Sequence, residues 1–177
     1  MNKFDEILTA AMRLFSEKGY HATSMRTIAK EAGIVQSSIY NHFPSKEAIL
    51  KEIMRVMGEE IVKTFEFDPT LPKSEKIEQY KKKILTSLKS GRQFWRMIHS
   101  IRLNGDIVDF LQPQMNQMES MVLQNLSNLL SGGKRKIKKE EVLLLWASID
   151  GIAASFLLIN DYPLEKVLNL LFEKYKE

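Results

Sequence analysis

The chain of 177 residues contains no cysteine, only three histidines and only eight glycines. Without cysteine, disulfides and thiolate metal sites are excluded, and we expect a reducing, cytoplasmic location. His21, His42 and His99 include no pair at metal-ligand spacing. The sequence also has no HExxH motif, no glycine-rich phosphate loop and no nucleophile elbow. We therefore expect no enzyme activity, no metal and no cofactor.

We also expect neither a signal peptide nor a membrane span. The start, MNKFDEILTA, has acids at Asp5 and Glu6 and no long apolar run behind a basic stretch. The longest apolar run, Val142 to Ile159, has Asp150 and Gly151 at its centre. A spanning helix needs about 20 mostly apolar residues, and an acid in mid-span is costly. We therefore expect a helix buried by other helices, and no membrane partner.

Positive charge is not concentrated at the N-terminus. The formal net charge is +4, but residues 1–50 carry six basic and five acidic residues. The excess lies in residues 73–102, with nine basic and two acidic residues, and in residues 132–141, with five basic residues. Net charge affects solubility and loose attraction to polyanions. It does not locate a DNA surface here, and KRKIKK at 134–139 is expected to be a solvated loop.

Apolar residues recur at helical spacing through almost the whole chain, and no segment alternates as a strand would. Ser24 can cap a short second helix, which Gly33 ends. A third helix is expected over 36–43, where Pro44 stops it, and Ser45 can cap the fourth. Further helices are expected at 74–90, 92–103, 106–131, 139–160 and from 163 onward. The sequence therefore predicts an all-α fold of about nine helices.

The two short helices on either side of Gly33 have the spacing of a helix-turn-helix. In that motif the second helix enters the major groove of DNA. Ile39 and Phe43, four residues apart, can hold this helix on the domain by a thin apolar face. Its polar side chains can hydrogen-bond to bases and phosphates: they are Gln36, Ser37, Ser38, Tyr40, Asn41 and His42. On spacing alone, a solvated connecting helix remains an alternative.

Residues 14–50 read LFSEKGYHATSMRTIAKEAGIVQSSIYNHFPSKEAIL. The features in register are Leu14-Phe15, Gly19-Tyr20, Thr23-Ser24, Ile28-Ala29, Ala32-Gly33, Tyr40-x-His42-Phe43, Ser45-Lys46-Glu47 and Leu50. This segment closely resembles the DNA-binding segment of the TetR family of bacterial transcriptional regulators. The resemblance implies a three-helix helix-turn-helix DNA-binding domain at 1–47. A larger helical domain for ligand binding and dimerisation would follow at 48–177.

The resemblance also implies a role for individual side chains. Phosphate contacts are implied for Ser24, Tyr40, His42 and Lys46, and base contacts for Gln36, Ser37, Ser38 and Asn41. Two residues depart from the family pattern: Val35 stands where serine or threonine is usual, and Ser37 stands where glycine is common. Plain structural roles remain open as well, because Tyr40 could pack on the domain and Lys46 could be an ordinary solvated lysine.

A single helix-turn-helix has a small footprint, and specific binding usually needs two half-sites about one helical turn apart or a multiple of it. We therefore expect a homodimer on double-stranded operator DNA, and the resemblance places its interface on the last two helices. Small residues there leave a strip for close helix approach, and an apolar stripe follows: Ala147, Gly151 and Ala154, then Leu164, Leu168 and Leu171. The alternative is that both helices are fully used within one subunit.

In the TetR family the larger domain usually binds a small molecule, so the resemblance implies an effector site. The candidate residues are Trp95, His99, Phe110, Met115, Met118, Trp146 and Asp150. Methionines and aromatics suit an adaptable apolar cavity, although plain core packing is the alternative for each. Asp150 could meet a cationic ligand, a basic side chain or a hydroxyl group across the dimer. Arg92, Arg96, His99 and Arg102 could instead meet an anion, touch the DNA-binding domain or be solvated.

These residues together predict a ligand-responsive, homodimeric transcriptional regulator of the TetR type, a repressor rather than an activator. The alternative is a helical small-molecule-binding or interaction module without sequence-specific DNA binding. A decayed recognition helix would be expected to lose Tyr40, His42 and Lys46 or to gain acids. All three are present, and no acid lies between Glu31 and Glu47. The regulator is therefore favoured.

Overall fold

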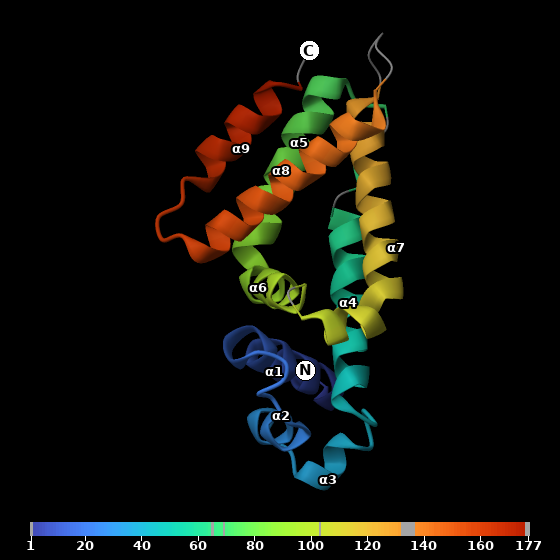
Figure 1. Ribbon diagram of the computed structural model, residues 1–177, viewed down its shortest axis with the longest axis vertical. Coiled ribbons are helices and arrows are strands. Elements are labelled where there is room, and N and C mark those ends of the chain that lie inside the picture. Colours follow the sequence, from blue (N-terminus) through green and yellow to red (C-terminus); the bar gives the residue numbers. More distant parts are fainter. Residues whose placement is uncertain (1, 65, 69, 103, 132–136, 176–177) are drawn as a thin grey trace. The chain divides into compact units, whose positions relative to one another are not determined.

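The computed structural model describes residues 2–64, 66–68, 70–102, 104–131 and 137–175. Within these ranges the chain forms nine α-helices, which confirms the all-α prediction (Figure 1). The helices belong to two compact units. The first contains Met1–Glu59 and Gln93–Gln114, and the second contains Glu60–Arg92 and Met115–Glu177. Residues 134–136 of the expected KRKIKK loop lie outside the described residues.

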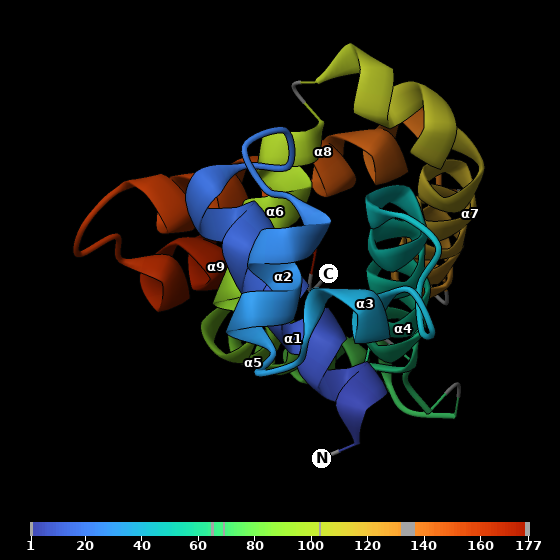
Figure 2. The ribbon, with the colours of Figure 1, turned by 90° about the horizontal axis from the view of Figure 1, so that it is seen from below.

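The helix bounds agree closely with those expected from the sequence, except that the third helix is shorter. In chain order the helices are α1 (Lys3–Lys18), α2 (Met25–Glu31), α3 (Gln36–Ile39), α4 (Lys46–Thr64), α5 (Lys73–Ser90), α6 (Arg92–Ile101), α7 (Gly105–Leu130), α8 (Lys139–Leu158) and α9 (Leu164–Glu173). Figure 2 shows α1, α2 and α3 of the first unit together, seen from below.

Local hydrogen bonds fix both ends of α2. The backbone N–H of Thr27 donates to the Ser24 hydroxyl at 3.1 Å, so Ser24 is the cap that the sequence predicted. At the other end Gly33 has φ +65°, a conformation that glycine adopts without strain. The N–H of Ile34 then donates to the carbonyl of Ala29 at 3.0 Å, which closes a Schellman-type end. The chain is thereby turned sharply between α2 and α3.

The third helix, α3, is held by two buried side chains. Ile39 is fully buried and Phe43 is 5% exposed, as the predicted thin apolar face requires. The Phe43 ring also stacks on Phe4 of α1, with 4.9 Å between the ring centroids. The prediction of a helix through residue 43 is wrong, because α3 ends at Ile39 and a turn follows. That turn keeps a hydrogen bond from the Phe43 N–H to the Ile39 carbonyl at 2.9 Å, just before Pro44.

The start of α4, α6 and the first part of α7 complete the first unit. The N–H of Ala48 donates to the Ser45 hydroxyl at 3.2 Å, which confirms Ser45 as the cap of α4. Buried apolar residues of these helices form the core: Ile49, Leu50, Ile53, Phe94, Met97, Ile98, Ile101, Ile107 and Leu111. Phe110 of α7 packs beside Tyr20, with 6.2 Å between ring centroids. The α1–α2 turn is therefore in contact with α7 inside this unit.

In the second unit α9 packs against both α5 and α8. Tyr80 of α5 and Phe172 of α9 are almost fully buried, with 6.1 Å between their ring centroids. Arg92 lies over the Phe156 ring at 4.8 Å and donates to the Leu157 carbonyl at 3.4 Å. A cation near the last carbonyls of a helix is favourable, so Arg92 stabilises the end of α8.

α8 has one buried face and one exposed apolar face. Among the described helices it is the one whose length and composition would allow it to cross a membrane. The expectation that other helices bury it is confirmed on one side, where the buried residues are Val142, Leu145, Ile149, Ile152, Ala153 and Leu157. On the other side Leu144 is 64% exposed and Leu158 is 82% exposed. α8 thus leaves a wide apolar surface uncovered within the single chain.

Candidate functional site

The polar residues of α3 and the following turn lie at the surface of the first unit. Ser38 is half-buried, and the exposed members are Gln36, Ser37, Tyr40, Asn41 and His42. The Tyr40 side chain is 51% exposed in spite of its aromatic ring. In the described part of the chain, none of these six side chains takes part in an internal hydrogen bond. Their donors and acceptors are therefore available to an outside partner.

Ser24 is exposed at the start of α2, but its hydroxyl already forms hydrogen bonds within the protein. It accepts the Thr27 N–H at 3.1 Å and lies 2.8 Å from the Thr27 hydroxyl. A hydroxyl oxygen has two lone pairs and one hydrogen. Ser24 can thus cap α2 and still approach a phosphate at this exposed end of the helix.

Lys46 is placed differently from the other predicted phosphate contacts. Its Nζ donates to the backbone carbonyls of Tyr20 and Thr23, each at 2.9 Å, and lies 4.1 Å from the centroid of the Tyr20 ring. Burial lowers the pKa of the Lys46 amine from its ordinary value, and the charge of Glu47 opposes that shift. Two of its three N–H donors are thus used within the protein. Sequence spacing did not reveal these partners.

Tyr20 links the α1–α2 turn to the start of α4. Its hydroxyl donates to Oε1 of Glu47 at 3.0 Å, while its ring packs between Phe15 and Phe110. Burial, followed by the hydrogen bond to Glu47, raises the pKa of the Tyr20 phenol above its ordinary value. Hydrogen bonds from the Glu47 backbone N–H and from Ser45 lower the pKa of the Glu47 carboxyl. Tyr20, Lys46 and Glu47 form the cluster that we call the α4 anchor.

A second contact joins the α1–α2 turn to α7. His21 Nε2 lies 3.3 Å from Oδ2 of Asp106, and both side chains are largely exposed. An exposed pair of this kind contributes about 0–1 kcal/mol to the free energy of unfolding. The Tyr20–Phe110 packing beside it is better shielded. The orientation of the turn therefore depends more on the aromatic pair than on the His21–Asp106 contact.

The predicted effector residues are divided between the two units. Trp95, His99 and Phe110 belong to the first, and Met115, Met118, Trp146 and Asp150 belong to the second. All seven are half-buried. Within the first unit Phe110 is already packed against Tyr20, and Lys51 Nζ lies 5.7 Å from its ring centroid. Phe110 therefore has a packing role within the first unit, which was the alternative to an effector contact.

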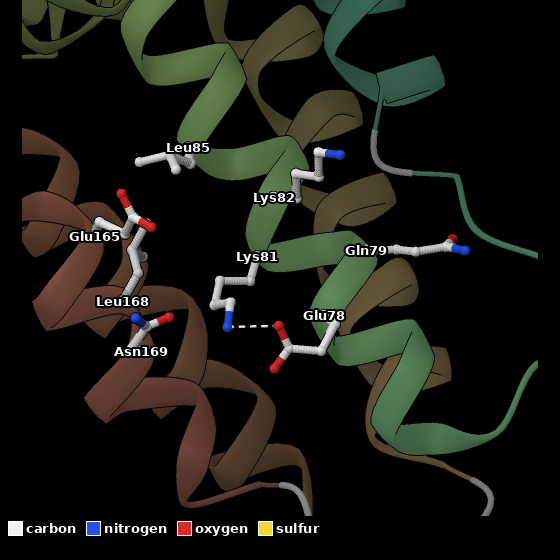
Figure 3. A pocket seen from close by; sticks show the side chains of 8 residues that line it. All are labelled: Glu78, Gln79, Lys81, Lys82, Leu85, Glu165, Leu168 and Asn169. Carbon is white, nitrogen blue, oxygen red and sulfur yellow. Dashed lines mark ion pairs between the residues drawn. The ribbon is translucent and has the colours of Figure 1, made fainter.

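Two hollows of the second unit are lined by other residues. One, of about 560 Å³, lies between α5 and α9 (Figure 3). Its lining is Glu78, Gln79, Lys81, Lys82, Leu85, Glu165, Leu168 and Asn169. Lys81 Nζ pairs with Glu78 at 2.6 Å, and the lining contains two lysines and two glutamates, so neither sign of charge dominates. Of this lining, sequence reasoning had singled out Leu168, as an interface residue.

The other hollow, of about 400 Å³, is lined by Glu66, Phe67, Lys76, Asn125, Asn128 and Ser131. Lys76 Nζ lies 5.6 Å from the centroid of the Phe67 ring. These residues come from the segment before α5, from α5 itself and from the end of α7. Sequence reasoning missed them, because no local spacing brings three separate segments together.

The predicted interface residues fall into two groups. Ala147 and Gly151 are exposed, and Ala154 is half-buried, on the uncovered side of α8. A Cβ added to Gly151 would meet no atom within 4 Å, so this strip is open. Leu164 and Leu168 of α9 are instead 3% and 1% exposed, within the core of the second unit, and Leu171 is half-buried. Prediction missed large exposed apolar residues in and just after α8, which include Leu144 and Leu158, and the exposed Leu170 of α9.

Five residues on the uncovered side of α8, four exposed and one half-buried, repeat at alternating spacings of three and four. The series is Leu144, Ala147, Gly151, Ala154 and Leu158. This is the spacing of a seam along which two helices pack together.

Among the described residues, no group of three or more His, Asp or Glu side chains is arranged to hold a metal ion.

Residues 7–53 match the family model described as bacterial regulatory proteins, tetR family. Within this segment the chain is 50% identical over 50 residues to the HTH-type transcriptional repressor KstR2 of Rhodococcus jostii (strain RHA1), covering 28% of this chain and 24% of that protein. It is 46% identical over 48 residues to the HTH-type transcriptional regulator UidR of Escherichia coli (strain K12), covering 27% and 24%. The matches thus span about a quarter of the length of these curated relatives.

Solved structures resemble nearly the whole chain. The fatty acid degradation regulator FadR from Bacillus halodurans has a TM-score of 0.84 at 20% identity, over 99% of this chain and 95% of that one. FadR from Bacillus subtilis, solved in complex with stearoyl-CoA, has a TM-score of 0.80 at 21% identity, over 98% of both chains. A TetR family protein from Vibrio parahaemolyticus has a TM-score of 0.72 at 21% identity, over 97% of both chains.

Because the sequence identities to the solved structures are low, the similarity over the whole chain concerns the fold alone. The N-terminal segment is similar to its relatives in sequence as well. The resemblance drawn from residues 14–50 is thus confirmed by two separate comparisons. Residues 7–53 therefore match the N-terminal domain of the TetR family of bacterial regulatory proteins, and the whole chain shares its helical fold with structures of TetR-family regulators.

Proposed function

We propose that the protein is a DNA-binding transcriptional regulator that binds a pseudo-palindromic operator as a homodimer. It acts as a repressor, and a small-molecule effector releases it from DNA. The observation that carries this proposal is the exposed polar surface of α3, held by Ile39 and Phe43, inside the segment that matches the family model. The DNA-binding domain comprises residues 1–47, and the regulatory domain comprises residues 48–177.

Individual roles follow from the exposure of each side chain. Ser24, Tyr40 and His42 contact phosphates, while the base edges are read by Gln36, Ser37, Ser38 and Asn41. For Lys46 we favour a positioning role, because two backbone carbonyls hold its ammonium group. It keeps the start of α4 against the α1–α2 turn and thereby fixes the orientation of α2 and α3.

The dimer forms along the uncovered face of α8. Ala147, Gly151 and Ala154 allow close approach of the partner helix, and Leu144 and Leu158 are covered by it. Exposed apolar side chains in one contiguous strip are typical of an interface. On α9 the residue offered to a partner is Leu170, since Leu164 and Leu168 are used within the subunit.

The effector binds in the regulatory domain, and the candidate contacts are treated unit by unit. Trp95, His99 and Phe110 are the candidates in the first unit, and Met115, Met118, Trp146 and Asp150 are the candidates in the second. Long-chain acyl-CoA is the first compound to test, because Bacillus subtilis FadR, which shares this fold, was solved with stearoyl-CoA. The candidates include one carboxyl group, at Asp150, and one imidazole, at His99, so both cationic and anionic effectors are screened. A compound that is an effector lowers DNA affinity without unfolding the protein.

Fluorescence anisotropy tests the DNA-binding proposal directly. The full chain is titrated onto duplex DNA from upstream of its own gene and onto a shuffled duplex, at two salt concentrations. We expect tighter binding to the native duplex, two chains per site and weaker binding at the higher salt concentration. Equal binding to many unrelated duplexes, or no binding by a folded dimer, would favour a helical sensing or interaction module instead.

A further inference from the structure

Val35, the residue immediately before α3, is an exposed apolar side chain on an otherwise polar surface. It precedes Ile39 by four residues and Phe43 by eight, so helical spacing would place all three on the buried face. Ile39 and Phe43 are buried, but Val35 is 68% exposed. Its backbone is extended, with φ −69° and ψ 148°, and therefore does not continue the helix. Val35 therefore does not belong to the buried face that anchors α3.

The same residue leaves α3 without a side-chain cap. Ser24 caps α2 and Ser45 caps α4 through hydroxyl groups that accept backbone N–H donors, at 3.1 and 3.2 Å. Valine has no acceptor, and α3 has no side-chain cap hydrogen bond. Serine or threonine at such a position normally stabilises a helix. Val35 therefore contributes neither a cap nor core packing to the first unit.

An isolated exposed valine would be unremarkable elsewhere on a protein surface. Here its neighbours are Gln36 and Ser37, both exposed, on the surface that we assign to DNA. In a helix-turn-helix the first residues of the recognition helix contact the base edges. The major groove displays one apolar group on the base edges, the C5 methyl group of thymine, and apolar side chains recognise it by direct contact.

We propose that Val35 reads a thymine methyl group in each half-site of the operator. The inference rests on the proposed DNA-binding function and adds a specificity-determining residue to it. Val35 contributes an apolar contact at the start of α3, where its neighbours Gln36 and Ser37 offer amide and hydroxyl groups. Valine at this position cannot cap α3. A serine or threonine could cap it, but its hydroxyl would then be directed at the helix and would not face the base.

The test removes the methyl group and nothing else. The full chain first selects its sites from a randomised duplex library, and each enriched thymine is then replaced by deoxyuridine in both half-sites. Covering one methyl group corresponds to about a fourfold change in affinity. We therefore expect roughly fifteenfold weaker binding for the symmetric replacement at one position, since two half-sites contribute. Deoxyuridine at thymines outside the enriched motif is the control and should have no effect.

Substitution of Val35 completes a double-mutant cycle. With Val35→Ala, the difference in affinity between the thymine and deoxyuridine duplexes should shrink at that position, because alanine has a smaller apolar surface, whereas Asn41→Ala should retain the difference. Val35→Ser should lose the difference while raising the thermal unfolding temperature, because it restores a cap. The exposure of Val35 means that none of these changes should disturb the fold, and far-UV circular dichroism checks this.

The outcomes separate the two proposals. If the library yields no enriched sequence, the DNA-binding function fails and this inference fails with it. If sites are enriched but contain no thymine whose methyl group matters, DNA binding stands and the role of Val35 is wrong. A deoxyuridine penalty that persists unchanged in Val35→Ala would also overturn the assignment, because another side chain would then be reading the methyl group.

Discussion

α3 and α8 are both helices with one buried and one exposed face, but their exposed faces are opposite in character. α3 exposes hydroxyl, amide and imidazole groups above two buried anchors. α8 exposes leucine, alanine and glycine opposite a fully apolar buried face. Polar groups remain hydrated until a charged, hydrated partner such as DNA arrives, and bridging water is normal there. Apolar side chains gain most when a partner excludes water from them. The two exposed faces therefore specify two kinds of partner.

The largest expected effect comes from placing a charge on the exposed face of α8. Ala147→Glu would bury an unpaired carboxylate in the proposed dimer, which costs about 3–5 kcal/mol of association free energy. Sedimentation velocity should show monomers where the native chain forms dimers, and affinity for a two-half-site duplex should fall with it. Thr86→Glu adds the same charge at an exposed position of α5 and should leave the dimer intact. If both variants sediment alike, the exposed face of α8 is not the interface.

The next effect concerns the buried side of α3. Ile39 is fully buried, so Ile39→Ala should lower the free energy of unfolding by about 2–5 kcal/mol through lost burial and a residual cavity. Urea denaturation followed by circular dichroism measures the change. Ser37→Ala, on the exposed side of the same helix, should change stability by less than about 0.5 kcal/mol. Similar losses from both substitutions would contradict the division of α3 into an anchoring and a reading face.

A substitution of Lys46 tests whether this residue contacts DNA or supports the fold beside the DNA-binding surface. Lys46→Met removes hydrogen bonds to two carbonyls and should lower stability by about 1–3 kcal/mol. DNA affinity should fall for all sequences, while the dependence of log affinity on log salt concentration stays the same. A phosphate contact predicts the reverse, with stability retained and the salt slope reduced by about 0.9 for each chain. Tyr40→Phe serves as a comparison, because it alters an exposed hydroxyl and should leave stability unchanged.

The smallest effect is a pH dependence at the α4 anchor. Hydrogen bonds lower the pKa of Glu47 in the folded protein, so folding is favoured when this carboxyl is ionised. Its contribution is complete above the ordinary carboxyl pKa of 4.5 and is lost as the pH falls through the lower folded value. Glu47→Gln should therefore destabilise the chain by less than about 1 kcal/mol at pH 7, since the group is exposed. The difference from the native chain should shrink below pH 4.5, as measured by urea unfolding.

Features that depend on local sequence were predicted well. The helices follow from apolar spacing, and the caps at Ser24 and Ser45 follow from a hydroxyl placed before a helix. The end of α3 was misplaced, because the hydrogen bond from the Phe43 N–H to the Ile39 carbonyl continues the helical pattern through a turn. A sequence pattern does not distinguish such a turn from a last helical turn.

Features that depend on which segments meet in space were predicted poorly. The stripe on α9 was expected to face a partner, but Leu164 and Leu168 are core, and Leu170 is the exposed leucine. Periodicity identifies an apolar face without saying what covers it. The partners of Lys46 lie more than 20 residues earlier in the chain, and no spacing rule connects them. The two hollows were missed for the same reason.

The α4 anchor changes how related sequences should be interpreted. A lysine that supports its own fold remains under selection even after a chain has stopped binding DNA, because losing it would destabilise the first unit. Its presence in a homologue is therefore evidence of a helix-turn-helix that folds, and not of one that still regulates a gene. Tyr40 and His42, which make no hydrogen bond inside the described part of the chain, are free to drift once the operator is gone. Those two positions therefore distinguish homologues that still bind DNA from homologues that no longer do so better than Lys46 does.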